Sequence, residues 1–262
     1  MIKKFVILFN LKNCLSIAFL LIFITAKPQN FIFKHITINE GLSSGNVWSI
    51  IQDSRGYFWF GTEDGLNKYD AYKFTVYRND PKDSTSISGN WIQSVVEDSN
   101  ALWICTRNGL NRYSYKSDNF KRYFNNGNDS NSISNSSLNN VIKDRKGQIW
   151  VGTNLGLSLY DRKNDKFIRY ATLPKNTQQT SSNQVRAITK DANDLLWLCT
   201  MDGLYQFDPL KNLFTRYLND LIIKENLVST MIHCVFIDKE QNIWIGTESD
   251  GLFYFNIALN KL

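Results

Sequence analysis

Apolar residues occur along this chain in short runs separated by Asp, Gly and Asn, and no run follows a helical period. Runs such as Val47–Ile51 and Val185–Thr189 are each followed by a segment with Asp first and often Gly fourth, the composition of a type I turn. Further runs follow Gly65 or begin at Phe74, and they are rich in the aromatic residues that favour strands. The pattern therefore predicts an all-β protein of short strands and tight turns.

These strands recur as copies of one motif, in which a Trp marks the second strand. The five motif residues are Trp59, Trp103, Trp150, Trp197 and Trp244. Their spacings are 44, 47, 47 and 47 residues. Each copy predicts one strand before the Asp, one around the Trp, one after a Gly-ended loop and one with the phrase Phe-x-x-Tyr, as in Phe74–Tyr77. Four short strands per repeat of this length indicate a β-propeller of five four-stranded blades.

The two ends of the repeat array leave two arrangements open. The fifth copy ends at Leu262 after its third predicted strand, whereas Phe33–Ile36 resembles the phrase of a fourth strand. A terminal strand that completes the last blade removes an unpaired sheet edge. We therefore expect either a closed five-bladed propeller, with Phe33–Ile36 at the outer edge of blade five, or an arc of a larger propeller.

The first 29 residues have the composition of an export signal. Lys3 and Lys4 precede an apolar run over residues 15–24, and Thr25 and Ala26 provide small residues for cleavage. The run is shorter than the roughly 20 residues of a spanning helix. We therefore expect a signal peptide over residues 1–29 and a propeller domain over residues 30–262, located in the periplasm or otherwise outside the cytoplasm.

Charge and cysteine usage narrow the function further. The net charge is +6, but residues 1–29 hold four lysines and no acid, so the remainder carries only +2. This small value gives no support for binding to nucleic acid. Three copies have Gly two residues after the motif Trp, and Cys105 and Cys199 occupy this position in the other two. We therefore interpret both cysteines as buried replacements for Gly and not as a disulfide.

The phrase Asp144–Asp161 and the lead-in Gly41–Asp53 resemble the two-component regulator propeller repeat. The resemblance implies the extracytoplasmic sensor part of a hybrid two-component protein, which recognises a carbohydrate fragment and signals to a histidine kinase. Such sensors usually carry more blades, an immunoglobulin-like domain, a membrane helix, a kinase and a receiver, none of which this sequence contains. We therefore expect this chain to be a sensor domain and not itself an enzyme, with a kinase module as a partner if it is part of a longer protein.

Residues with catalytic or metal-binding chemistry form no recognisable site. His35 and His233 lack the spacing of metal ligands, and no nucleophile or phosphate-loop motif occurs. The Asp in the turn between the first and second strands of each copy, such as Asp144, is interpreted as a turn former, and the Trp column as core. The sequence accordingly predicts no catalytic residue, no metal and no cofactor.

Candidate ligand-binding residues stand where the repeat is constant but the side chain varies. One position in the first strand of each copy varies in this way: Trp48, Gln93, Asn139, Arg186 and His233. The loops between the second and third strands also vary, and supply Asp64, Arg107, Asn108 and Asp202. Trp91 lies outside the repeated Trp column, so packing does not account for it. We expect these residues on one face, because in a propeller the loop between the second and third strands and the connection from one blade to the next share a face.

Three functions fit these observations. The first is a sensor that binds an oligosaccharide or another small ligand, for which mixed amide, aromatic and Arg side chains are suited. The alternative is a protein–protein interaction or dimerisation propeller, in which two copies of the chain form a homodimer. The third, less favoured by the residues, is a propeller lyase or glycosidase.

Overall fold

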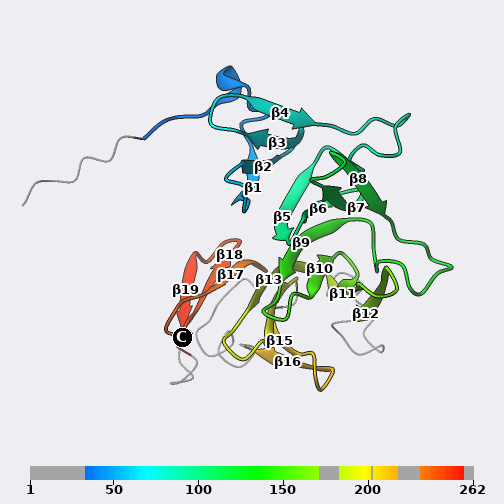
Figure 1. Cartoon of the computed structure of the whole chain (residues 1–262). Coiled ribbons are helices and arrows are strands. Elements are labelled where there is room, and N and C mark those ends of the chain that lie inside the picture. Colours follow the sequence, from blue (N-terminus) through cyan, green and yellow to red (C-terminus); the bar gives the residue numbers. More distant parts are fainter. Residues whose placement is uncertain (1–32, 171–182, 202, 218–230, 257–262) are drawn as a thin grey trace, which may run out of the picture. The chain divides into compact units, whose positions relative to one another are not determined.

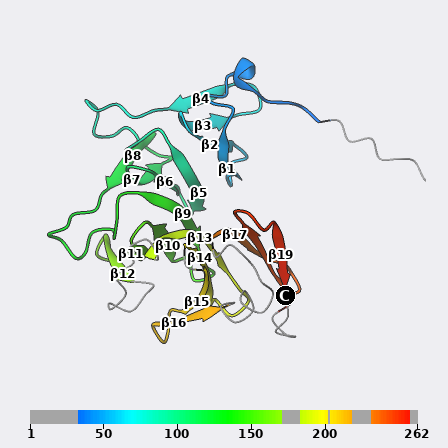
Figure 2. The same cartoon turned by 180° about the vertical axis from the view of Figure 1, so that it is seen from behind.

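The computed structural model describes residues 33–170, 183–201, 203–217 and 231–256. Five antiparallel sheets follow one another along the chain as the blades of a five-bladed β-propeller, which confirms the predicted all-β class (Figure 1). The same sheets are seen from behind in Figure 2. Strands within each sheet pair in chain order, so each blade is a meander whose strands we call A to D.

The strand bounds agree closely with the predicted runs. Blade one holds β1 (Val47–Gln52), β2 (Phe58–Thr62), β3 (Gly65–Tyr69) and β4 (Phe74–Tyr77). Blade two holds β5 (Ile92–Asp98), β6 (Ala101–Thr106), β7 (Gly109–Ser114) and β8 (Asn119–Tyr123). Blade three holds β9 (Leu138–Lys143), β10 (Ile149–Thr153), β11 (Gly156–Asp161) and β12 (Lys166–Tyr170). Blade four holds β13 (Val185–Lys190), β14 (Leu196–Thr200), β15 (Gly203–Asp208) and β16 (Leu213–Tyr217).

Blade five has three strands within the described residues, β17 (Ile232–Ile237), β18 (Ile243–Thr247) and β19 (Leu252–Phe255). The strand predicted at Phe33–Ile36 is wrong, because residues 33–37 have no regular secondary structure. Residues 1–36 form a unit separate from residues 37–262. The predicted signal peptide, residues 1–29, lies outside the described residues. A single 3-10 turn, η1 (Ile38–Glu40), precedes the first blade and is closed by a capping box between Thr37 and Glu40.

The core is distributed in layers between neighbouring blades. Trp59 of blade one lies in a cluster with Ile92, Leu102 and Ile104 of blade two. The next three pairs of blades bury equivalent clusters around Trp103, Trp150 and Trp197. All four of these Trp side chains are fully buried, which confirms their interpretation as core. Each blade is therefore stabilised mainly by the face that it shares with its neighbour.

The A strands are also joined from blade to blade by hydrogen bonds. The Ser49 hydroxyl accepts from the Val95 backbone N–H at 3.1 Å, and the Ser94 hydroxyl accepts from that of Val141 at 3.2 Å. In the next junction the side-chain oxygen of Asn140 accepts from the Ile188 N–H at 3.2 Å. The column of small residues in strand A thus does more than fit a crowded interior, since it fixes the register between successive blades.

In blades one to four, the residue two positions after the motif Trp lies against the A strand of the next blade. A Cβ on Gly61 would lie 2.7 Å from Cγ2 of Ile92, so this position permits very little side chain. Cys105 and Cys199 occupy the same column and are buried free thiols, which confirms the prediction for them. Burial raises the pKa of both thiols well above the ordinary value.

The Asp that begins each A–B turn has a second role that the sequence did not indicate. In blade one the carboxylate of Asp53 accepts from the backbone N–H of Tyr57 at 2.9 Å and from the indole N–H of Trp59 at 2.7 Å. The pairing between turn carboxylate and Trp indole occurs in all five blades, and the indole is fully buried in the first four. Because a buried N–H without a partner is costly, the same carboxylate stabilises both the turn and the core.

Candidate ligand-binding site

The B–C loops and the chain entering strand A meet at one rim of the propeller. The backbone N–H of Arg107 donates to the Trp91 carbonyl at 3.2 Å. Equivalent bonds join Asn154 to Ser137 and Glu248 to Met231, each at 3.2 Å. The two kinds of connection therefore share one face, as the repeat pattern predicts, and we call this face the B–C rim.

A β-bulge places the variable residue of each A strand at the B–C rim. In blade one the pairing of β1 with β2 shifts between Val47 and Ser49, so that Trp48 is the extra residue. The same shift occurs in every other blade, at Gln93, Asn139, Arg186 and His233. A bulge removes one residue from the ladder and changes the direction of its side chain. This explains why a position inside a strand varies while its neighbours stay apolar or small.

An aromatic and basic cluster joins blades one and two. The rings of Trp48 and Trp91 lie 6.0 Å apart at 34°, and the Arg107 guanidinium lies 3.5 Å from the centroid of the Trp91 ring. Trp91 precedes β5 instead of beginning it, and its indole nitrogen is buried without a hydrogen-bond partner among the described residues. Because Arg107 covers Trp91, the exposed aromatic surface belongs to Trp48, whose exposed fraction is 52%.

Amide side chains occupy the equivalent place between blades three and four. The Asn139 amide donates to the Asn154 side-chain oxygen at 3.0 Å and to the Val185 carbonyl at 2.9 Å. Gln184 donates to the same oxygen of Asn154 at 2.9 Å. Sequence reasoning missed Gln184, although it occupies the position in blade four that Trp91 occupies in blade two. Comparing that column across the copies would have identified it.

The junction of blades four and five is charged. Nη1 of Arg186 lies 3.1 Å from Nε2 of His233, and that nitrogen lies 3.9 Å from a carboxylate oxygen of Glu248. Both Arg186 and His233 are bulge residues, so adjacent bulges bring their side chains into contact. The guanidinium presents further donors to solvent, which suits recognition of a carboxylate or sulfate.

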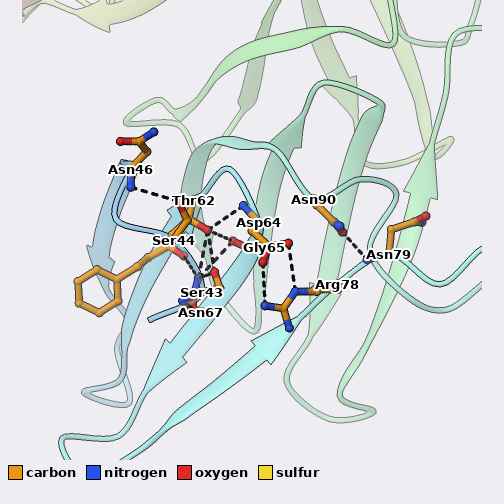
Figure 3. A network of polar contacts seen from close by, with 11 residues as sticks. Ser43, Ser44, Asn46, Thr62, Asp64, Gly65, Asn67, Arg78, Asn79 and Asn90 are labelled. Carbon is orange, nitrogen blue, oxygen red and sulfur yellow. Dashed lines mark hydrogen bonds and ion pairs between the residues drawn. The ribbon is translucent and has the colours of Figure 1, made fainter. Parts of the chain in front are cut away.

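Two of the predicted residues instead hold the rim loops in place. Asp64 forms a bidentate ion pair with Arg78, at 2.9 and 3.2 Å (Figure 3). The Asn108 amide donates to the Ser88 carbonyl at 3.1 Å. Asp64 and Asn108 therefore support the rim, whereas Asp202 lies outside the described residues and Gln93 is placed only as the bulge of blade two.

A buried polar network anchors the chain beneath this rim. Ser43 contacts Thr62 at 2.8 Å, and the Asn67 amide donates to Ser43 at 2.8 Å (Figure 3). The network recurs as Ser88, Thr106 and Asn111 in blade two and as Ser134, Thr153 and Ser158 in blade three. It makes the rim a rigid support for the bulge residues.

Within the described ranges, no group of three or more His, Cys, Asp or Glu side chains is arranged to hold a metal ion. Within the same ranges, no helix is long and apolar enough to cross a membrane.

Comparison with protein families gives a match to the two component regulator propeller, over residues 41–64 and 226–249. Over 71 residues the chain is 52% identical to histidine kinase P4 of Formosa agariphila. That alignment covers 27% of this chain and 5% of the kinase.

Solved structures show the same fold. The extracellular domain of a putative hybrid two component system from B. thetaiotaomicron matches with a TM-score of 0.58 and 27% identity. The match covers 88% of this chain and 36% of that domain, so the chain spans about a third of its length. A virginiamycin B lyase from Staphylococcus aureus matches with a TM-score of 0.60, over 83% of this chain and 72% of the lyase. Its identity is only 14%, so this likeness concerns the fold alone.

Proposed function

Because this chain carries two-component regulator propeller repeats, we propose that residues 30–262 form a ligand-binding sensor domain that works outside the cytoplasm. In this proposal residues 1–29 direct export, the ligand is an oligosaccharide, and the signal passes to a histidine kinase module of the full-length protein. The similarity to the extracellular domain of a hybrid two component system supports this function over catalysis.

The observation that carries the proposal is the set of five bulges on one rim. Each bulge directs a different side chain to the same face while the ladder on both sides continues. Trp48 presents an exposed indole, and an aromatic ring can stack on the apolar face of a sugar at low entropic cost. Arg107 and Arg186 provide charge for an acidic sugar, and Asn139 provides an amide.

The experiment is calorimetric titration of the full chain with neutral and acidic oligosaccharides. We expect Trp48→Ala and Arg107→Ala each to weaken binding by tenfold or more, because each removes a contact that no neighbour replaces. Arg186→Ala should weaken binding of acidic sugars more than that of neutral ones. Thermal midpoints should change little, since Trp48 and Arg107 are exposed, Arg186 is only half-buried, and all three lie outside the ladder.

Tyr72 provides the matched control. Its side chain is exposed and lies in the C–D turn of blade one, at the opposite end of the strands. Tyr72→Ala should leave binding unchanged. Binding that survives the three rim substitutions, or that is lost only together with folding, would contradict the proposal.

A protein-binding role is the second candidate, and exposed apolar side chains favour it. Ile50 and Phe58 of blade one, and Phe236 and Leu252 of blade five, are exposed large hydrophobic residues. Such a surface can be covered by a second copy of the chain. Light scattering across a concentration series tests this role. A homodimer would have twice the mass of the chain, and Ile50→Glu should return the mass to that of the monomer.

A further inference from the structure

A pocket lies between blades three and four, at the rim opposite to the candidate site. It has a volume of about 410 Å³, with Trp150, Leu159 and Tyr170 among its apolar lining. The A–B turns of both blades and the C–D turn of blade four complete it, contributing Asp144 and Pro209 among others. The pocket thus lies where the sequence indicated only turn formers.

The same place is filled at the two preceding junctions. Between blades two and three, Nη1 of Arg162 lies 2.7 Å from the Asp98 carboxylate, and Nη2 donates to the Gly147 carbonyl at 2.6 Å. Between blades one and two, Tyr115 donates to Glu97 at 3.1 Å, and the Arg55 guanidinium covers its ring at 4.1 Å. In both cases a residue of the C–D turn fills the crevice beside the A–B turn of the preceding blade.

Pro209 is the counterpart of these two residues. Tyr115, Arg162 and Pro209 each follow by two positions the strand C residue that pairs with the Phe of strand D. Proline has neither a ring hydroxyl nor a guanidinium. The crevice beside Asp144, which is the counterpart of Asp98, therefore stays open as the pocket.

A second interaction is missing from this junction as well. Between blades two and three, the hydroxyls of Tyr123 and Tyr160 both donate to Asp165, at 2.8 and 2.7 Å. In blade four the counterparts of Tyr160 and Asp165 are Phe207 and Asn212. Tyr170, the counterpart of Tyr123, lines the pocket and has no such carboxylate among the described residues.

The charges of the pocket indicate what it can bind. One oxygen of Asp194 is buried without a hydrogen-bond partner among the described residues, and Asp144 lies in the same pocket. Asp208 adds a third carboxylate to the lining, and Lys146 adds one cation. Lys190 attracts the Asp144 and Asp194 carboxylates electrostatically. At the filled junction its counterpart Lys143 lies 4.0 Å from Asp98. The Asp98 carboxylate thus binds the Arg162 guanidinium in addition to the nearby lysine.

We infer that this pocket binds a guanidinium-bearing small molecule, whose cationic group takes the place beside Asp144 that Arg162 takes beside Asp98. The planar group would lie between the Asp144 and Asp194 carboxylates and against the aromatic floor. This site is separate from the B–C rim, so its existence does not depend on the proposed function.

The test uses agmatine, which carries a guanidinium on a short chain, and n-butylamine as the probe that lacks this group. The Trp150 indole N–H donates to Asp144 at 3.0 Å, so its NMR resonance reports on that carboxylate. We expect agmatine to shift this resonance saturably, and n-butylamine to bind at least tenfold more weakly. Absence of a saturable shift with agmatine, or equal binding of both probes, would overturn the inference.

Two substitutions supply the matched comparison. Pro209→Arg should fill the pocket from within and weaken agmatine binding at least tenfold. Arg162→Ala should open the filled junction, so that agmatine also shifts the resonance of Trp103, whose indole bonds to Asp98. If Pro209→Arg fails to fold, the gained response at Trp103 still decides the result. Unchanged binding to folded Pro209→Arg, or no response at Trp103, would contradict the inference.

Discussion

The A strands of blades one and two have similar apolar patterns but different surroundings. Ile50 and Val95 occupy the same register position, yet the exposed fraction is 59% for Ile50 and 5% for Val95. Blade one lies against Val95, whereas no described blade covers Ile50. The repeat thus determines which residue stands at a position, and the neighbouring blade determines how much that residue stabilises the fold.

Blade five shows the same contrast at the face that lies away from blade four. The leucine that pairs with the small-residue column is the second residue of strand C in the first four blades and is fully buried there: Leu66, Leu110, Leu157 and Leu204. Leu252 is their counterpart, and its exposed fraction is 65%. Substitutions in covered and uncovered blades therefore measure the contribution of the neighbour directly.

The largest difference is expected for the Trp column. Trp150→Ala should lower the free energy of unfolding by about 3–5 kcal/mol, because a large buried ring is lost from the layer between blades three and four. Trp244 is only half-buried, so Trp244→Ala should cost clearly less. Urea unfolding of both variants measures this difference, and equal losses would show that the two environments are alike in solution.

The leucine column should follow. Leu157→Ala is expected to cost about 2–5 kcal/mol, as buried leucine truncations do. Leu252→Ala should cost less than about 1 kcal/mol, because most of its side chain is already in water. A large loss for Leu252→Ala would mean that this face is covered in solution, by another blade or by a second copy.

The valine position should give a smaller effect. Val95→Ala removes two buried methyl groups, so a loss of about 2 kcal/mol is expected from roughly 0.8 kcal/mol per methylene with a small cavity. Ile50→Ala should be close to neutral, although it removes more carbon. Thermal melts of the two variants under the same conditions provide the measurement. If Ile50→Ala is the more damaging change, the outer face of blade one is covered in solution.

The smallest effect concerns acid stability at the filled junction. Burial acts to raise the pKa of Asp98, but the hydrogen bond and charge of Arg162 hold that pKa below its ordinary value. A lowered folded pKa stabilises the fold above the unfolded pKa, near 4, and this contribution is lost as the pH falls further. We expect a loss of up to about 1 kcal/mol, since Arg162 is partly exposed.

Removing the arginine reverses the sign of this contribution. In Arg162→Ala the carboxylate keeps its burial but loses its principal cation, so its folded pKa rises. The free energy of unfolding should then decline less steeply between pH 5 and pH 3 than in the unsubstituted protein. A steeper decline would contradict the assigned role of Arg162.

The sequence predicted the strands well because each repeat states the same pattern again. Strand D of blade one was placed at Phe74–Tyr77, the bounds found for β4. The error at Phe33–Ile36 has a physical origin, since a four-residue apolar phrase becomes a strand only when a sheet edge pairs with it. Phe33–Ile36 lies outside the repeats, so no equivalent segment in another copy could test the predicted strand.

The candidate site was predictable only in part. Variation between copies identified the column that contains Trp48. The bulge that explains this column is not marked by any particular residue type, so the sequence did not predict it. The cover of Arg107 over Trp91, and the indole bond of Asp144, depend on side-chain directions that a one-dimensional pattern does not contain. Pro209 becomes informative only after Arg162 is seen to fill the neighbouring junction.

The repeated bulge also bears on how such a protein can change over generations. Each duplication of a blade copies one position whose side chain lies outside the ladder, so substitutions there should be tolerated at little cost to folding. A chain with more blades would gain such positions in proportion. Recognition could then diversify by point substitution on a fixed scaffold, and a new specificity would require no insertion and no new loop.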